Sequence, residues 1–391
     1  MGICGCLIVA SIVAGGPVEF RRHDIDAFPA GYQVAVVDVN GDGRLDVLAL
    51  STNADRIDWY ENPGWKRRPV ATTPKNIDLA VREVDGGLQL AIATGFYFDD
   101  ASRGGEVYLL QRPKGAGLDS VWPSRRIAVD PVTHRLRWGD LDGSGRKQLI
   151  HAPLFGQGSR GAVAPTPAHL MAFRLDSEAD QLDPHGKMID ESLTVLHGIC
   201  VSDLDNDGRD EILTASFEGI HRFDLEGDPS LWRWKKSQIS AGASPDSTQP
   251  GAARGSSEIA PGNLGEGRSM LAAIEPWHGN QVVVYTPTAD GQSWQRQVLD
   301  DTLKEGHALV VADIDKDGAD EIIAGWRGGS GGLRVYDLAD QQSMKFQTKD
   351  IDQGIAVEGL VAADMNGNGW LDLVAIAGRT NNLVWYENLS H

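Results

Sequence analysis

The sequence has few cysteines and few basic residues, and both shortages exclude functions. Only 3 of the 391 residues are cysteine, and Cys4 and Cys6 lie at the N-terminus, which leaves Cys200 alone in the rest of the chain. No disulfide framework can therefore stabilise the fold. Lysine and arginine number 36 against 55 aspartate and glutamate, which makes the net charge −19. We expect no nucleic-acid partner, because affinity for the phosphate backbone depends on clustered basic side chains.

The sequence also offers no segment long enough to cross a membrane as a helix. Its leader, MGICGCLIVASIVAGG, is apolar over roughly 12 residues, whereas a span needs about 20. The leader ends in small residues, as a secretory signal peptide does. We therefore expect a signal peptide over residues 1–16, one domain over 17–391, and a secreted or periplasmic protein. A mis-assigned start or a buried strand is the alternative for the leader.

What the chain does contain is a repeat. The stretch VAVVDVNGDGRLDVLAL (34–50) recurs in four further clear copies, at 136–152, 199–215, 309–325 and 360–376. Two degenerate copies, at 80–94 and 259–275, fill the gaps. The seven copies are spaced 45 to 63 residues apart, a period typical of a four-stranded propeller blade.

Each copy supplies two strands around an acidic turn, and an alternating segment and a basic, polar segment follow as third and fourth strands. The last copy ends at its third strand, and a matching fourth segment, VEFRRHDI (18–25), precedes the first copy. The N-terminal strand would then complete the C-terminal blade and leave no free edge. The sequence predicts an all-β, seven-bladed β-propeller closed by its N-terminal strand.

The acidic turns predict calcium sites. In DVNGDGRLD, oxygen-bearing side chains recur at alternate positions and a glycine stands where the backbone must turn sharply. Calcium takes six to eight hard oxygen ligands, which such a loop can wrap around one ion. We expect about five structural calcium ions, with these ligands: Asp38, Asn40, Asp42, Asp46; Asp140, Asp142, Ser144; Asp203, Asp205, Asp207, Glu211; Asp313, Asp315, Asp317, Glu321; and Asp364, Asn366, Asn368, Asp372. The degenerate turns at Glu83 and Asn263 lack these ligands and are expected to bind nothing.

A second group of polar residues falls at one position of the repeat, six residues before the first acidic ligand. Blades three, four and six have His134, His197 and His307 there, and blade seven has Glu358. Ring geometry would point these side chains at the central axis, on the face opposite the calcium turns. They suit a transition metal, Zn²⁺ or Mn²⁺, or an acid/base set; hydrogen-bonded filling of the channel is the alternative. The predicted catalytic residues are His134, His197, His307, Glu358, Glu258 and Tyr32.

Loops that follow the second strands reach the same face and mix aromatic with charged residues. Aromatic rings stack on the C–H faces of sugars, and charged groups bind hydroxyls. The predicted substrate-binding residues are Trp277, His278, Trp326, Arg327, Phe155, Arg160 and Tyr97.

The Asp-x-Asp/Asn-x-Asp-Gly turns resemble the FG-GAP/VCBS repeats of calcium-binding propellers, over residues 18–389. The face with the histidines resembles the propeller part of aldos-2-ulose dehydratases, and its histidines are similar to the metal-binding histidines of oligogalacturonate lyases. This resemblance implies a carbohydrate lyase that performs β-elimination on a keto-sugar or uronate. The alternative is a non-catalytic, calcium-dependent propeller that binds glycans or proteins, since FG-GAP/VCBS propellers include both kinds.

Overall fold

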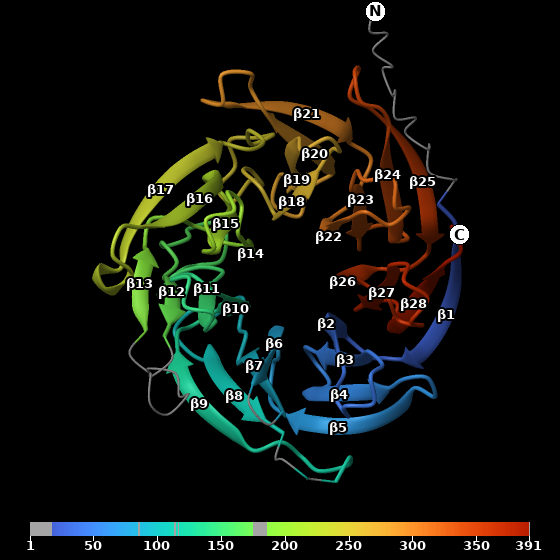
Figure 1. The fold of residues 1–391 in the computed structure, drawn as a ribbon. Coiled ribbons are helices and arrows are strands. Elements are labelled where there is room, and N and C mark those ends of the chain that lie inside the picture. The colour runs from blue at the N-terminus through green and yellow to red at the C-terminus, as the bar shows by residue number, and fades with distance from the viewer. Residues whose placement is uncertain (1–17, 85–86, 113–114, 116, 175–185, 391) are drawn as a thin grey trace, which may run out of the picture.

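The strands expected from the repeat form seven blades around one axis (Figure 1). The structure is a computed structural model that describes residues 18–84, 87–112, 115, 117–174 and 186–390. Within these residues each blade is a four-stranded antiparallel sheet, and the one helical element is a short 3-10 turn, η1 (Pro229–Leu231). The predicted seven-bladed, all-β propeller is confirmed.

Each blade begins with the strand nearest the axis. From the inside outward, the first four blades are β2 (Gly31–Val37), β3 (Asp46–Ser51), β4 (Arg56–Glu61), β5 (Lys66–Thr72); β6 (Asp78–Val84), β7 (Gly87–Thr94), β8 (Glu106–Gln111), β9 (Ser124–Val129); β10 (Thr133–Gly139), β11 (Gln148–Pro153), β12 (Leu170–Phe173), β13 (Lys187–Asp190); and β14 (Gly198–Ser202), β15 (Glu211–Ser216), β16 (Gly219–Glu226), β17 (Arg233–Ser240). The last three are β18 (Glu258–Asn263), β19 (Ser269–Glu275), β20 (Gln281–Pro287), β21 (Trp294–Asp300); β22 (Gly306–Ala312), β23 (Glu321–Trp326), β24 (Gly332–Asp340), β25 (Lys345–Gln353); and β26 (Val357–Ala363), β27 (Asp372–Ala377), β28 (Asn382–Asn388), β1 (Phe20–Ala27).

The ring closes through the two ends of the chain. Strand β1 pairs antiparallel with β28, with Phe20 opposite Asn388 and His23 opposite Trp385. The last blade therefore takes its outer strand from the N-terminal region, as the sequence predicts. This pairing removes the free edge that an open ring would present.

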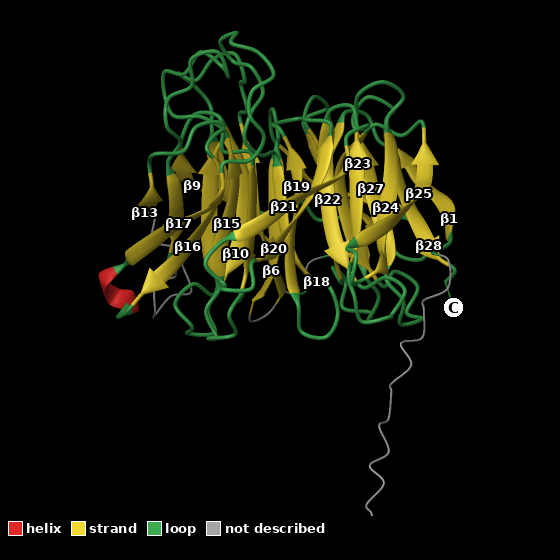
Figure 2. Cartoon of the chain, turned by 90° about the horizontal axis from the view of Figure 1, so that it is seen from above, coloured by secondary structure: helices red, strands yellow, loops and turns green. Residues whose placement is uncertain are grey.

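Apolar side chains fill the space between neighbouring blades. All six residues of β3 are buried, as are those of β11, β15 and β27, which explains why second strands read as nearly continuous apolar runs. Between the first two blades, Leu48 and Trp59 pack in one cluster with Leu90. The inner strands run between the two faces of the ring seen edge-on in Figure 2. Their first residues therefore meet at one face and the acidic turns at the other.

No helix among the described residues has the length and apolar character that a membrane span requires. The predicted signal peptide, residues 1–16, lies outside the described residues.

Candidate functional site

Three histidines predicted to share one position of the repeat meet near the axis. His134 and His307 are the second residues of β10 and β22, and His197 immediately precedes β14. The ring centroid of His197 lies 4.8 Å from that of His134 and 5.2 Å from that of His307. Inner strands of successive blades are neighbours around the ring, so one position of the repeat becomes one place in space.

A fourth histidine joins this group from a different part of its blade. His278 follows β19, and its Nε2 lies 2.9 Å from Nε2 of His197. Its ring centroid lies 5.4 Å from that of His307. The sequence places His278 among substrate-binding residues, whereas the structure places it inside the histidine cluster, which we define as His134, His197, His278 and His307.

The histidine cluster is neutral. His134, His197 and His307 are at most 2% exposed. Burial holds the pKa of all four histidines well below its usual value, and the nearby Arg135 guanidinium lowers it further. Each imidazole therefore has one lone pair and one N–H at neutral pH.

Backbone carbonyls assign the ring protons of two of these histidines. His197 Nδ1 lies 3.0 Å from the carbonyl oxygen of Ser257, and His307 Nδ1 lies 2.8 Å from that of Glu358. A carbonyl only accepts hydrogen bonds, so both Nδ1 atoms carry the proton. The Nε2 atoms of His197 and His307 therefore present lone pairs.

Arginines assign the other two histidines. Arg327 Nη2 donates to Nδ1 of His278 at 3.2 Å, and Arg135 Nη1 donates to Nε2 of His134 at 3.1 Å. An arginine only donates, so His278 carries its proton on Nε2 and directs it at the lone pair of His197. The cluster thus contains both proton acceptors and a proton donor.

Tyr32 supplies a second donor. Its hydroxyl oxygen lies 3.1 Å from Nε2 of His307 and 3.2 Å from Nε2 of His134. Burial raises the pKa of Tyr32, so the hydroxyl keeps its proton. This residue is the second of β2, where the sequence predicts it.

Two glutamates support the cluster from outside. Glu258 Oε1 lies 3.0 Å from Nδ1 of His197 and accepts from Arg135 Nη2 at 3.2 Å. Glu358 Oε2 lies 3.4 Å from Nδ1 of His307 and accepts from Arg327 Nη1 at 2.9 Å. Burial raises the pKa of both carboxyls, and the arginines oppose that rise. The glutamates touch the Nδ1 side of the rings and so orient them.

The cluster fits a transition metal only in part. Nitrogen atoms of His197, His278 and His307 lie within 4.8 Å of one another, close enough to share an ion. His197 and His307 present Nε2 lone pairs to that ion, but His278 directs its Nε2 proton inward because Arg327 occupies Nδ1. A bound Zn²⁺ or Mn²⁺ would require His278 to exchange tautomers and lose that arginine contact.

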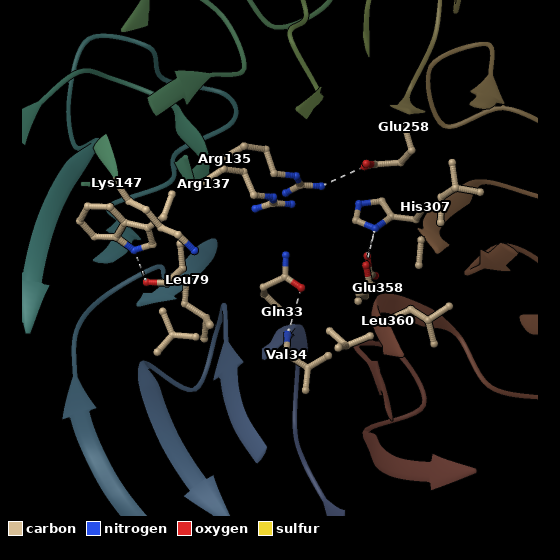
Figure 3. A pocket seen from close by; sticks show the side chains of 17 residues that line it. Gln33, Val34, Leu79, Arg135, Arg137, Lys147, Glu258, His307, Glu358 and Leu360 are labelled. Carbon is tan, nitrogen blue, oxygen red and sulfur yellow. Dashed lines mark hydrogen bonds and ion pairs between the residues drawn. The ribbon is translucent and has the colours of Figure 1, made fainter. Parts of the chain in front are cut away.

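A cavity of about 410 Å³ opens along the axis below the cluster (Figure 3). Its walls come from the inner strands β2, β6, β10, β18, β22 and β26, together with Lys147 just before β11. Among the described residues that line it, His307 is the one histidine. It lies with Glu258 and Glu358 near the end at which these strands begin, and Val81, Trp138 and Val361 lie toward the end with the acidic turns.

Of the aromatic residues in the predicted substrate-binding loops, one borders the histidine cluster and two pack into hydrophobic clusters. Trp277 stacks on His278 at 4.5 Å between ring centroids and so borders the cluster. Phe155 is fully buried in a hydrophobic cluster with Phe217 and packs the loops instead of lining a ligand site. Trp326 packs against the core that contains Tyr336.

The remaining predicted substrate residues lie outside the cluster or contact it through a hydrogen bond. Arg103 lies over the ring of Tyr97 at 4.0 Å, and Arg160 is exposed. Arg327 contacts His278 and Glu358 directly.

The sequence did not identify the polar residues that line the channel beyond the histidine cluster. Arg135 follows His134 and contacts it; Arg137 and Asp78, which form an ion pair of 3.0 Å, lie further from the cluster. Gln33 donates to Asp78 at 2.8 Å. The signal was available, because polar residues inside the apolar inner strands have to face the channel or pair with one another.

The acidic turns are closed by their own hydrogen bonds. In the first turn, Asp38 accepts from the backbone N–H groups of Gly41, Asp42 and Gly43 at 2.7 to 3.1 Å. Gly43 has a φ of +86°, a conformation that favours glycine. Asp46 accepts from the backbone N–H of Val39 and so joins the two ends of the turn.

Two of the five turns gather three carboxylates closely. Oxygen atoms of Asp313, Asp315 and Glu321 lie within 4.8 Å of one another, and a second such group holds Asp203, Asp205 and Glu211. Asp313 Oδ1 and Glu321 Oε1 are buried and have no hydrogen-bond partner among the described residues. Unpartnered buried carboxylate oxygens fit a hard cation such as calcium.

The two turns differ in how their charge is balanced. Arg222 of β16 contacts Asp205 at 2.5 Å and Glu211 at 3.3 Å. Near Glu321, Asp337 of β24 adds a negative charge instead. Burial and the repulsion of Asp315 raise the pKa of Glu321 to about 9, whereas burial opposed by Arg222 raises that of Glu211 to about 7.

Parts of the chain match known protein families. Residues 30–57 match the FG-GAP repeat and residues 313–375 an FG-GAP-like repeat. Residues 104–288 match the family described as aldos-2-ulose dehydratase, beta-propeller domain. The protein is thus a seven-bladed propeller that carries FG-GAP repeats, and both resemblances expected from the sequence are confirmed.

A curated relative shows the same likeness at greater length. The chain is 24% identical over 403 residues to aldos-2-ulose dehydratase of Phanerodontia chrysosporium. This similarity covers 93% of the present chain but 43% of the relative, so the chain spans less than half of that protein. Among solved structures, a lectin of Agrocybe aegerita described as recognising non-reducing terminal N-acetylglucosamine has a TM-score of 0.55, at 14% identity over 93% of this chain and 87% of the lectin. That likeness shows the fold alone.

Proposed function

We propose that the protein is an exported, calcium-stabilised propeller that acts on carbohydrate as a carbon–oxygen lyase. The reaction is β-elimination on a keto-sugar or uronate at the end of the channel with the histidine cluster. The observation that carries this proposal is the convergence of lone pairs on His197 and His307 with an N–H of His278 and the hydroxyl of Tyr32. The similarity to a dehydratase propeller supports the same reaction class.

Elimination needs one acceptor and one donor close together. In the proposed reaction, Nε2 of His307 accepts the proton on the carbon next to the carbonyl or carboxylate. A carbon–carbon double bond forms as the carbon–oxygen bond at the next carbon breaks. The departing oxygen takes a proton from Tyr32 or His278 and leaves as water or an alcohol. No oxidant or reductant is consumed.

The chain's other residues hold this set in place. Glu358 and Glu258 orient His307 and His197 through Nδ1, and Arg327 fixes the tautomer of His278. A divalent ion held by His197, His278 and His307 would polarise the substrate carbonyl. Because the tautomer of His278 opposes such an ion, the acid/base set is our preferred assignment.

The experiment measures unsaturated product. Purified protein is incubated with keto-sugars and uronate oligosaccharides, and ultraviolet absorbance reports the new double bond. We expect product from the wild type and a loss of at least about 100-fold in His197→Ala and His307→Ala. His169→Ala, at a partly exposed histidine outside the cluster, is the matched control and should keep full activity. A wild type without product on the whole panel would refute the lyase and leave a glycan- or protein-binding propeller.

Metal analysis of the same samples separates the two versions of the site. One Zn²⁺ or Mn²⁺ per chain that disappears in His197→Ala would establish a metal. Activity in metal-free protein would establish the acid/base set.

A further inference from the structure

We infer that the channel cavity binds a sugar that carries an acidic group, with that group held by Arg137 and Lys147. This inference rests on the proposed function, because it selects among the carbohydrates that the cluster would act on. It concerns the half of the cavity that the sequence did not identify as a site.

The cavity has a basic wall. Arg135, Arg137 and Lys147 line it, against two carboxylates, Glu258 and Glu358. In Figure 3 the guanidinium groups of Arg135 and Arg137 lie side by side and face the open centre, across from His307. When Asp78, which pairs with Arg137, and Arg327, which pairs with Glu358, are counted as well, the site keeps an excess of one positive charge, in a chain with a net charge of −19. It marks the cavity as the place where an anion is preferred.

Both carboxylates are already matched at the histidine end. Glu258 accepts from Arg135, and Glu358 accepts from Arg327. Through its other terminal nitrogen, Arg135 donates a hydrogen bond to His134. These pairs leave Arg137 and Lys147, further along the channel, as the groups that a ligand can reach.

Arg137 is held ready for a ligand. Its Nη1 contacts Asp78 at 3.0 Å and donates to the backbone carbonyl of Leu136 at 2.7 Å. Asp78 is fully buried and also accepts from Gln33 and from the backbone N–H of Leu136. The guanidinium is thus fixed through one nitrogen, and the side chain stays 33% exposed. A planar guanidinium with free N–H groups suits a carboxylate or a phosphate.

Lys147 adds a free charge beside Arg137. It is exposed, and no hydrogen bond or ion pair joins its amine to another residue in the described part of the chain. The partly exposed apolar residues Val81, Leu309 and Val361 complete the wall and offer contacts to the C–H groups of a sugar ring. A volume of about 410 Å³ accommodates a small sugar. A sugar anchored at Arg137 and Lys147 would extend toward His307, which lines the same cavity.

Calorimetric titration at low ionic strength tests the inference. Glucose, glucuronate and glucose 6-phosphate are titrated into the full chain. We expect an acidic sugar to bind at least about 10-fold more tightly than glucose, and this preference to weaken with added salt. Whichever acidic sugar binds more tightly identifies carboxylate or phosphate as the preferred group.

Two variants and a control complete the test. Arg137→Gln should weaken the acidic sugar about 10-fold or more, because it removes the guanidinium. Since it also leaves Asp78 buried without its ion pair, Lys147→Gln is the second variant, and we expect a loss of about 3-fold. Lys345→Gln, on the outer strand β25, makes the same change of charge and should alter nothing.

Affinity for both acidic sugars no higher than for glucose, or unchanged affinity in both variants, would overturn the inference but leave the carbohydrate function standing. If none of the three sugars binds, the inference fails, and the product assay with keto-sugars and uronates decides the proposed function separately.

Discussion

The two ends of the inner strands use polar side chains in opposite ways. At one end, four histidines from different blades form a neutral cluster in which His278 donates a hydrogen bond to His197. At the other end, each acidic turn concentrates carboxylates from one short segment of chain. The first arrangement suits proton transfer and the second suits a cation. The cluster depends on contacts between blades, whereas each turn is closed by hydrogen bonds within its own hairpin.

Calcium removal is expected to produce the largest effect, and only at the acidic end. Chelation by EDTA should lower the melting temperature sharply. When the free calcium concentration is 100 times the Kd of a site, that site contributes about 2.7 kcal/mol to the free energy of unfolding. Scanning calorimetry with EDTA, followed by titration with excess calcium, measures the loss and its recovery. An unchanged melt would contradict the assignment of the turns.

Replacing a glutamate behind the histidines is expected to change activity but not calcium dependence. Glu358→Gln keeps a hydrogen-bond acceptor for Arg327 and removes the negative charge beside His307. Loss of such an orienting partner costs about 10- to 100-fold. The readout is kcat across a pH series, because a purely structural role would lower the melting temperature and leave the shape of the pH profile unchanged. Glu305→Gln, at an exposed partner of Arg327, is the matched control.

The two three-carboxylate turns should respond differently to the loss of one charge. In calcium-free protein at pH 8, Glu321→Gln should raise the free energy of unfolding by about 1–3 kcal/mol, because burial raises the pKa of Glu321 to about 9 and the folded chain must bind a proton there that the unfolded chain does not bind. Glu211→Gln should raise the free energy of unfolding by less, since Arg222 already contacts Glu211. Both variants should lose stabilisation by calcium. Equal responses in calcium-free buffer would show that Arg222 does not set the difference.

Acid should destabilise the fold through a buried histidine outside both regions. His151 is fully buried, and burial lowers its pKa from 6.5 to about 3, with a smaller contribution from His169. Between pH 6.5 and about 3, the unfolded chain therefore binds a proton at this histidine and the folded chain does not. Stability is lost as the pH falls from about 6.5 toward 3, by about 1.4 kcal/mol per pH unit. Urea unfolding between pH 7 and 5 should show a smaller slope in His151→Gln, and an equal slope would exclude this histidine.

The smallest effect is expected at the degenerate turns. Glu83→Gln and Asn263→Ala should leave the calcium-dependent gain in the free energy of unfolding within about 0.5 kcal/mol of the wild type, as typical surface substitutions do. A larger loss would place a calcium site in a turn that lacks the ligand pattern.

The repeat made the fold predictable. Each blade is a local meander whose strands follow one another in the chain, so periodic apolar runs and turn residues were sufficient to identify seven blades. Even the closure of the ring could be predicted, because VEFRRHDI matched the missing outer strand. The acidic turns could be predicted equally well, since all the expected ligands of one turn lie within nine residues of sequence.

The candidate site was only partly predictable. Counting from the turns identified His134, His197, His307 and Tyr32, because these share one position of the repeat. His278 was assigned to a substrate loop, and Arg135 and Arg137 were missed, because their roles depend on contacts between blades. Phe155 had the same loop position as exposed aromatics, and only packing shows that it is buried.

The sequence by itself therefore determined the seven blades, the closing strand and the position of the acidic turns, because local spacing and hydrophobic pattern specify them. Only the tertiary structure decided which nitrogen of each histidine carries the proton, which acidic turn has an arginine beside its carboxylates, and where the basic wall of the channel lies. Those properties arise from distances of about 3 Å between residues that are far apart in the chain, and such distances exist only once the ring has closed.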